Sequence, residues 1–146
     1  TDPEFMVMAR TDALANEGIT ATLERAQAYV AAGAEAIFIE AVTEISQYKT
    51  FSDALSVPIL ANMTEFGMTP LSSLEQLQQQ GVNMALYPLT AFRAMNQAAA
   101  NVYTQLRADG TQAALLAKLQ DRETLYDYLN YHAYEQDLDQ AAKKDE

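Results

Sequence analysis

Residues 23–40, LERAQAYVAAGAEAIFIE, contain in one stretch the unit from which the fold is built. Leu23, Ala26 and Val30 recur at steps of three and four residues, the spacing of one face of a helix. The glycine that follows stands where a left-handed cap would close that helix. Ala36–Ile39 is then apolar at consecutive positions, which is typical of a strand buried on both faces of a parallel sheet. The stretch therefore predicts a helix followed by a buried parallel strand.

Three more apolar runs of this kind precede residue 90 and extend the pattern in both directions. They are FMVMA at residues 5–9, PILA at 58–61 and MAL at 84–86. Successive runs begin about 20 to 30 residues apart, which leaves room for one helix and two short loops, as a parallel crossover needs. The sequence therefore predicts an α/β fold with four parallel βα units.

Capping residues mark the ends of the expected helices. Pro70 and the spacing from Ser72 to Glu75, typical of a capping box, predict the start of a helix that Gly81 ends. A longer helix is expected over residues 90–110, because apolar residues recur there at steps of three and four.

After Gly110 the pattern changes to helices without strands, over residues 113–119 and from Glu123 onward. We therefore expect two parts, βα units in residues 1–110 and a helical extension in residues 111–146. Tyrosines crowd into the extension, and they fit either a contact with another subunit or packing on the same domain. They are Tyr126, Tyr128, Tyr131 and Tyr134.

Polar residues stand at the carboxyl end of every expected strand. In a (β/α)8 barrel this rim carries the chemistry; an open sheet also uses its carboxyl edge, so the feature favours a barrel. A complete barrel has eight units in about 250 residues, so this chain is expected to be half of a TIM-type barrel. Two unpaired strand edges and an apolar inner surface would then invite association with more polypeptide. The polar residues are Arg10, Thr11, Asp12, Glu40, Asn62, Thr64, Thr90 and Arg93.

Composition excludes several classes of function. The 146 residues suffice for one domain, and a net charge of -11 gives no attraction for nucleic acid or anionic lipid. The absence of cysteine excludes disulfides, a thiolate zinc site and a cysteine nucleophile within these residues. No apolar stretch approaches the ~18 residues of a membrane span and no signal-peptide pattern is found, so a cytoplasmic protein is expected.

Four segments carry a resemblance to a known family. In this order they resemble the carboxyl-terminal half of the 2-methylisocitrate lyase family, within the isocitrate lyase and phosphoenolpyruvate mutase superfamily. Several linked motifs are a more specific signal than one. The resemblance implies the last four βα units of a barrel, an amino-terminal half as partner, and a homotetramer whose terminal helices swap between subunits. The segments are TDPEFMVMARTDAL (1–14), ERAQAYVAAGAEAIFIEA (24–41), VPILANMTEFGMTPL (57–71) and MALYPLTAFRAMN (84–96).

The resemblance also implies an activity and a set of site residues. Enzymes of this family use Mg2+ to cleave 2-methylisocitrate, a tricarboxylate, into pyruvate and succinate in propionate breakdown. By resemblance, Arg10 and Glu40 are catalytic, and Phe38 and Leu86 shape the pocket for the extra methyl group, which is worth about 1 to 3 kcal/mol. The residues implied to contact substrate are Arg10, Glu40, Asn62, Met63, Thr64, Arg93 and Arg122.

These residue types suit a tricarboxylate. The planar guanidinium of Arg10 can hold a carboxylate through two parallel hydrogen bonds, and Asn62 and Thr64 offer neutral donors to a second one. An ionised Glu40 cannot bind an anion, so we expect it to orient Arg10 or to hydrogen-bond a protonated or hydroxyl group. Ordinary roles stay open as well: a strand-end ion pair for Arg10, turn residues at 62 and 64, and a surface pair for Arg122.

The family's magnesium-binding aspartates, glycine-rich loop and catalytic cysteine belong to the amino-terminal half. Because this chain contains no cysteine, it lacks the proton donor, and we expect it to be inactive alone. Two alternatives stay open. One is another superfamily enzyme, such as an oxaloacetate decarboxylase or a phosphonopyruvate-type enzyme; the other is a non-catalytic α/β module that assembles through its edges. A native protein near twice this size favours the enzyme, and one of this size favours the module.

Overall fold

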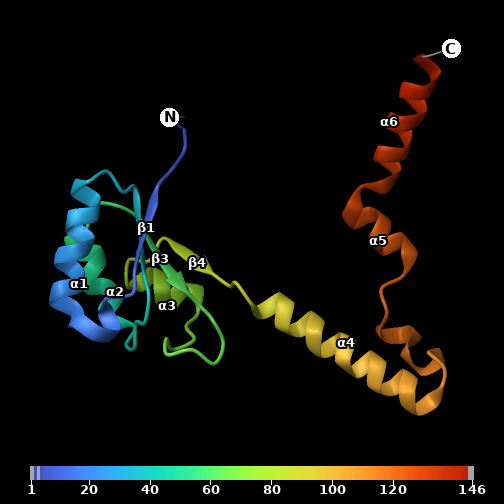
Figure 1. The fold of residues 1–146 in the computed structure, drawn as a ribbon, viewed down its shortest axis with the longest axis horizontal. Helices are drawn as coiled ribbons and strands as arrows, with labels where there is room; N and C mark the ends of the chain where they lie inside the picture. Colours follow the sequence, from blue (N-terminus) through green and yellow to red (C-terminus); the bar gives the residue numbers. More distant parts are fainter. Residues whose placement is uncertain (1, 3, 145–146) are drawn as a thin grey trace. The chain divides into compact units, whose positions relative to one another are not determined.

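The computed structural model describes residue 2 and residues 4–144, so Thr1 and Pro3 of the first resembling segment lie outside the described residues. The chain divides into two compact units, Thr1–Asn96 and Gln97–Glu146. The elements in chain order are β1 (Met8–Thr11), α1 (Leu14–Ala31), β2 (Ala36–Ile39), α2 (Ser46–Ala54), β3 (Ile59–Asn62), α3 (Leu74–Gln79), β4 (Met84–Leu86), α4 (Thr90–Asp109), the 3-10 helix η1 (Ala113–Lys118), α5 (Arg122–Leu129) and α6 (Tyr131–Lys144) (Figure 1).

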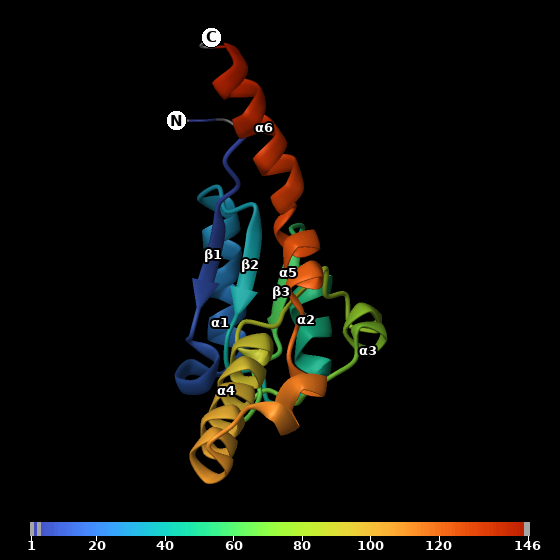
Figure 2. The ribbon, with the colours of Figure 1, turned by 90° about the vertical axis from the view of Figure 1, so that its right-hand side faces the viewer.

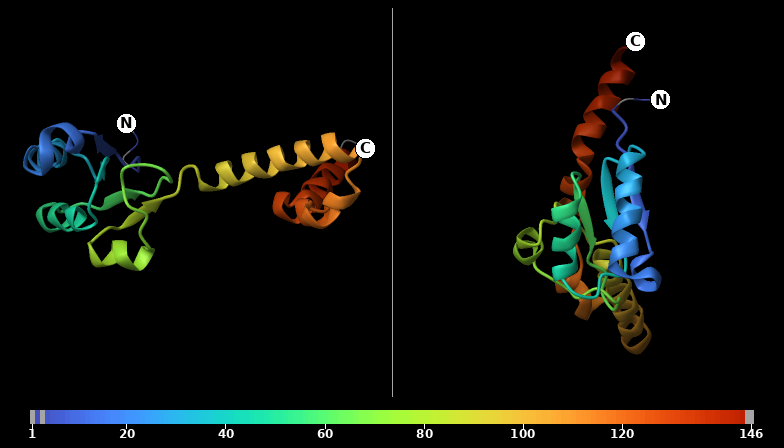
Figure 3. Two further views of the ribbon diagram at one scale, coloured as in Figure 1. Left: turned by 90° about the horizontal axis from the view of Figure 1, so that it is seen from below. Right: turned by 90° about the vertical axis from the view of Figure 1, so that its left-hand side faces the viewer.

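The four strands form one parallel sheet in the order β1-β2-β3-β4, so neighbours in the chain are neighbours in space. Figure 2 shows β1, β2 and β3 side by side with α1 and α2 behind them. In Figure 3, α1, α2 and α3 follow one another along the same side of the sheet. A doubly wound open sheet would reverse its strand order and place helices on both faces. The predicted half of a (β/α)8 barrel is therefore confirmed.

Alternate strand residues build a core on the helix side of the sheet, which we call the outer face. Ile37 and Ile59 are fully buried there, against Tyr48 and Phe51 of α2 and Leu77 of α3. Period-two alternation sends every second side chain to this face. The helices of the chain therefore complete the outer face.

The opposite side, the inner face, carries the remaining strand residues. Phe38, Leu60 and Met84 are only partly buried, and Leu86 is 38% exposed. The prediction of strands buried on both faces is therefore wrong for this chain as it stands, because α1, α2 and α3 cover one face only.

The first strand lies further along the chain than predicted. Residues 5–9 were expected to form it, but β1 starts at Met8 and ends at Thr11. Met8 pairs with Ala36, the first residue of β2, so the residues before it have no neighbouring strand. Phe5 is accordingly 73% exposed. The position of the partner strand, and not the apolar run, sets where β1 begins.

The capping box of α3 is built one residue later than predicted. Ser73 Oγ accepts from the Gln76 amide at 3.2 Å, and Gln76 Oε1 accepts from the Ser73 amide at 2.9 Å. The predicted pair, Ser72 and Glu75, is therefore wrong. The predicted stop is confirmed, since Gly81 follows with φ of 78° and a Cβ there would lie 2.3 Å from Ser52 Oγ.

The second unit contains most of α4 and all later helices. The expected helix over residues 90–110 is confirmed by α4, and the region 113–119 forms the 3-10 helix η1. Residues from 122 onward form two helices, because Asn130 adopts a left-handed conformation with φ of 50° between them. The boundary at residue 110 stays a prediction. Within the described residues, no helix combines the length and apolar character of a membrane span.

Two of the four clustered tyrosines contact each other. The rings of Tyr126 and Tyr131 stack with centroids 4.3 Å apart, and His132 meets the Tyr126 ring edge-on at 5.6 Å. Tyr128 and Tyr134 are 80% and 66% exposed. The stack joins α5 to α6, while a subunit contact through the exposed tyrosines stays a prediction.

Candidate functional site

Polar side chains from three neighbouring strands meet at the carboxyl ends of the sheet. Arg10 lies on β1, Glu40 comes directly after β2, and Asn62 is the last residue of β3. Arg10 pairs in register with Phe38, and Asn62 with Leu86. The parallel register therefore aligns these positions across the sheet, as the barrel prediction required.

Direct contacts join these side chains into one network. Arg10 Nη2 lies 3.6 Å from Glu40 Oε2, and Asn62 Nδ2 donates to the same Glu40 oxygen at 3.3 Å. Thr64 Oγ1 donates to Asn62 Oδ1 at 2.7 Å. Glu40 thus lies between a cation and an amide donor, the arrangement expected of a carboxylate that orients Arg10.

A second carboxylate and an aromatic ring fix the direction of Arg10. Its Nε and Nη2 donate to Asp12 at 3.0 and 2.8 Å, and its guanidinium lies 4.7 Å from the ring centroid of Phe38. The hydrogen bond with Asp12 raises the pKa of Arg10 against the opposing effect of burial, and the same bond lowers the pKa of Asp12. The Arg10 side chain is still 51% exposed, so it can reach a ligand.

The chain around Glu40 carries a feature that the sequence did not reveal. Ala41 has φ of 62°, a left-handed conformation that is uncommon for a residue with a side chain, and it turns the backbone directly after Glu40. Tyr48 of α2 is 1% exposed. Burial and, secondarily, the Glu40 charge raise the Tyr48 pKa to about 12, with the Asn62 backbone opposing them. Tyr48 therefore stays protonated beside the network, a role that helix periodicity alone does not distinguish from core packing.

Met63 and Thr64, the other members of the predicted loop, face different surroundings. Met63 is 2% exposed and belongs to the outer core, and its amide donates to the Leu86 carbonyl at 2.8 Å. Thr64 is partly buried and belongs to the polar network. Only Thr64 of this pair presents its side chain at the rim.

The two remaining predicted arginines, Arg93 and Arg122, are not members of the network around Glu40. Arg93, in the first turns of α4, donates from Nη1 to Glu65, which directly follows Thr64. Arg122 is the first residue of α5, in the second unit, and its contact with substrate stays a prediction. Glu65 was not predicted as a site residue.

The described residues do not form a metal centre by themselves. None of residues 2 and 4–144 belongs to a group of three metal-ligating side chains. Asp12 and Glu40, the carboxylates of the rim, both pair with Arg10. The residues present therefore do not fit a magnesium ion unless further ligands are supplied.

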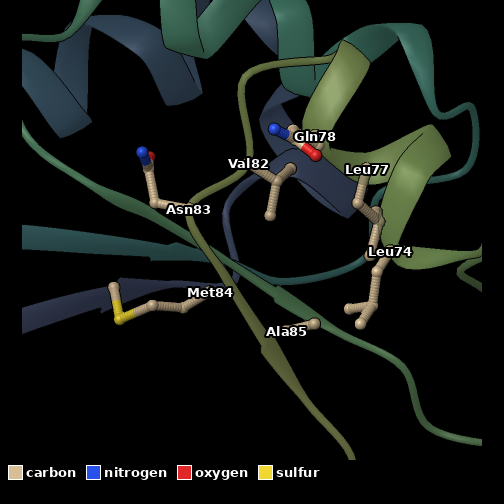
Figure 4. A pocket seen from close by; sticks show the side chains of 7 residues that line it. All are labelled: Leu74, Leu77, Gln78, Val82, Asn83, Met84 and Ala85. Carbon is tan, nitrogen blue, oxygen red and sulfur yellow. The ribbon is translucent and has the colours of Figure 1, made fainter.

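Among the clefts near the sheet, two differ clearly in chemistry. One of about 320 Å³ is lined by Arg10, Thr11 and Asp12 together with residues of α1. Another of about 370 Å³ lies between α3 and the segment leading into β4, and Figure 4 shows Leu74, Leu77 and Val82 beside it. The second cleft contains no predicted site residue, so we place the site at the polar rim.

Comparison with known proteins identifies the family to which the chain belongs. The family model for phosphoenolpyruvate phosphomutase matches residues 1–107. The 2-methylisocitrate lyase of Escherichia coli (strain K12) is 58% identical over 139 residues, which cover 95% of this chain and 47% of that protein.

Two solved structures are similar to the chain in fold. One is 2,3-dimethylmalate lyase, with a TM-score of 0.83, 27% identity and coverage of 93% of this chain and 48% of that one. The other is phosphonopyruvate hydrolase in complex with oxalate and Mg++, with a TM-score of 0.77, 26% identity and coverage of 92% and 48%.

The parallel half-barrel with polar side chains at its carboxyl rim has the (β/α)8-barrel fold of the phosphoenolpyruvate mutase and isocitrate lyase superfamily. The chain belongs to the phosphoenolpyruvate phosphomutase family. It spans about half the length of the curated relatives it matches, which are named 2-methylisocitrate lyase.

Proposed function

We propose that this chain supplies the carboxyl-terminal half of the active site of a 2-methylisocitrate lyase. The observation that carries the proposal is the network of Arg10, Glu40, Asn62 and Thr64 at the rim, in a chain 58% identical to such an enzyme. The reaction cleaves a carbon-carbon bond in a tricarboxylate to give pyruvate and succinate. It needs groups that bind carboxylates and a group that accepts the hydroxyl proton.

In this proposal the residues of the chain bind and orient the substrate. The guanidinium of Arg10, held by Asp12 and supported by Phe38, grips one carboxylate. Asn62 donates its second amide hydrogen to a second carboxylate, Thr64 holds that amide through its Oδ1, and Glu40 keeps the arginine and the amide in their orientations. Phe38 and Leu86 face the inner side, where they form an apolar wall for the substrate's methyl group.

The amino-terminal half of the enzyme is the partner that this proposal requires. The inner face is only partly buried, and residues of a complementary half-barrel would cover it and pair with the edge strands β1 and β4. That half would supply the magnesium ligands, since the described residues present no three-ligand group. Magnesium, when bound, stabilises the carbonyl that forms on cleavage. A homotetramer with swapped terminal helices, a role in propionate catabolism and a cytoplasmic location belong to the same proposal.

A fusion protein tests the proposal. The amino-terminal part of the E. coli relative, to which this chain has no counterpart, is joined to residues 1–146, and pyruvate formation from 2-methylisocitrate is measured with Mg2+ present. The fusion is expected to turn over substrate and the chain alone is not. Arg10→Lys in the fusion keeps the charge but loses the bidentate grip, so kcat/KM should fall about 100-fold, equivalent to about 2.7 kcal/mol.

Besides a fusion without lyase activity, two results would overturn the proposal. One is turnover by the chain alone at a rate that the amino-terminal part does not raise. The other is a fusion that cleaves oxaloacetate or phosphonopyruvate but not 2-methylisocitrate, which would assign the chain to a different enzyme of the superfamily.

A further inference from the structure

The loop between β3 and α3 begins at the polar network, and its first residues are attached to the start of α4. Thr64 belongs to the polar network, and Glu65 is the next residue. The side chain of Glu65 accepts a hydrogen bond from the hydroxyl of Thr90, the first residue of α4. One carboxylate therefore connects the loop that carries Thr64 to the start of α4.

Arg93 adds two contacts to the same residue. Its Nη1 donates to the Glu65 backbone carbonyl at 2.5 Å and to Glu65 Oε2 at 3.1 Å. Both contacts use Nη1, so Nε and Nη2 are the pair of nitrogens that can hold a carboxylate side-on. The Arg93 side chain is 37% exposed, which leaves it accessible to a ligand. The contacts with Glu65 thus select which edge of the guanidinium can meet substrate.

The ring of the next residue, Phe66, lies under the Arg93 guanidinium. Phe66 places its ring centroid 5.2 Å from the Arg93 guanidinium carbon. Phe66 is 96% exposed and has φ of 63°, a left-handed conformation that a bulky aromatic residue rarely adopts. Burial of Phe66 does not explain that conformation. The contacts of Glu65 with α4 and of Phe66 with Arg93 hold the loop in it.

We propose that Glu65 is a positioning residue, which fixes Arg93 and the Asn62–Thr64 segment in one arrangement for binding a substrate carboxylate. The role of Arg93 as a substrate contact rests on the proposed function, whereas the attachment of the loop by Glu65 does not. Glu65 acts through Arg93 and touches no reacting atom. The hydrogen bond from Thr90 and the Arg93 charge lower the pKa of Glu65, so its carboxylate stays ionised at neutral pH.

The experiment combines kinetics with hydrogen exchange on the fusion protein described above. Glu65→Gln retains the shape of the side chain but removes its charge, and we expect KM for 2-methylisocitrate to rise about 10-fold or more with a smaller change in kcat. In an Arg93→Met background, the same Glu65→Gln change is expected to alter kcat/KM less than twofold, because its effect passes through Arg93. Glu65→Asp restores part of the affinity.

A matched control separates this role from the loss of any glutamate–arginine pair. Glu17 holds Arg25 at 2.7 Å on α1, and Glu17→Gln is expected to leave KM and kcat unchanged. Amide exchange over residues 62–73 and 89–93 is followed in the same proteins. In these segments, Glu65→Gln is expected to exchange its amide hydrogens faster than the unmodified fusion. Glu17→Gln is expected to exchange them at the same rate as the unmodified fusion.

The outcomes distinguish the two proposals. Equal KM effects of Glu65→Gln with and without Arg93, or unchanged amide exchange in Glu65→Gln, would overturn the positioning role. A fusion that lacks lyase activity altogether would overturn the proposed function, and the exchange arm would still decide whether Glu65 holds the loop. Faster exchange with an unchanged KM in an active fusion would show that the attachment exists but does not serve substrate binding, and this also overturns the positioning role.

Discussion

The two faces of the sheet are built from the same strands, yet they differ in how completely this chain covers them. On the outer face, Ile37 and Ile59 are fully buried by the helices. On the inner face, their neighbours Phe38 and Leu60 are only partly buried, and Arg10 is half-exposed. The outer face is thus a finished core, whereas this chain leaves the inner face only partly covered.

Within each strand, the residues of the core and the residues of the candidate site lie on opposite faces. Residues that face outward are apolar, apart from Thr11, and make contacts within this chain. Residues that face inward include every member of the polar network at the rim. Substitutions on the two faces should therefore affect different measurements, even when they are adjacent in sequence.

The largest expected effect comes from a matched pair in β3. Ile59→Ala removes a fully buried side chain and should lower the free energy of unfolding of the chain by about 2 to 5 kcal/mol. Leu60→Ala, on the inner face, should cost about 1 kcal/mol or less in the chain alone, because the side chain leaves no closed cavity. Urea unfolding followed by circular dichroism measures both values.

The fusion protein sharpens this comparison. If the amino-terminal half covers the inner face, the cost of Leu60→Ala should rise toward that of Ile59→Ala. Equal costs in the chain alone would show that the inner face is already packed, which contradicts the partial burial of Leu60.

A smaller effect is expected on substrate choice. In the fusion protein, Phe38→Trp together with Leu86→Thr changes the size and the polarity of the proposed methyl pocket. The ratio of kcat/KM for 2-methylisocitrate to that for isocitrate should fall about 10- to 100-fold, because one methyl group in an apolar pocket is worth about 1 to 3 kcal/mol. Competition between the two substrates measures the ratio directly, and an unchanged ratio would remove these residues from the specificity pocket.

The smallest effect concerns acid stability at the inner rim. The bond with Arg10 lowers the pKa of Asp12 in the folded chain, so the folded state binds its proton less readily than the unfolded state. The resulting stabilisation is present above the ordinary carboxyl pKa, about 4, and is lost as pH falls through the lowered value. Unfolding free energies of the chain and of Asp12→Asn should therefore converge below that range.

The exposure of the pair limits this contribution. The side chains of Arg10 and Asp12 are 51% and 64% exposed, so 1 M salt should reduce the difference between the two proteins at neutral pH. A difference that persists at low pH and high salt would assign the effect of Asp12 to packing.

Local sequence patterns predicted the order of the elements well, because period and capping are local properties. The strands at 36–39 and 84–86 and the helix of residues 90–109 lie where the patterns placed them. The first strand was misplaced because its start depends on pairing with Ala36, a contact between distant residues. The choice between Ser72 and Ser73 as the helix cap likewise depended on backbone geometry that both spacings allow.

The strand-end pattern predicted where the polar residues of the candidate site lie, and the resemblance implied their roles. Arg10, Glu40 and Asn62 were expected at one rim, and the structure brings them together. Glu65 and Tyr48 were missed, because residue type alone does not reveal their contacts with distant residues. Glu65 contacts Thr90 and Arg93, which are 25 and 28 positions away, and Tyr48 is affected by Glu40 and Asn62, which are 8 and 14 positions away. A glutamate placed directly after the predicted loop was the only available signal.

The parallel register has a consequence for how this site can change. Arg10 lies opposite Phe38, and Asn62 opposite Leu86, because each strand is locked to its neighbour. A one-residue insertion or deletion just before Ile37 would shift the rest of β2 by one position. Ile37 and Ile39 would then point to the inner face, and Phe38 would point into the core of the outer face. Length variation is therefore confined to the connecting segments, and diversification of the catalytic rim must proceed by replacing side chains at constant strand length.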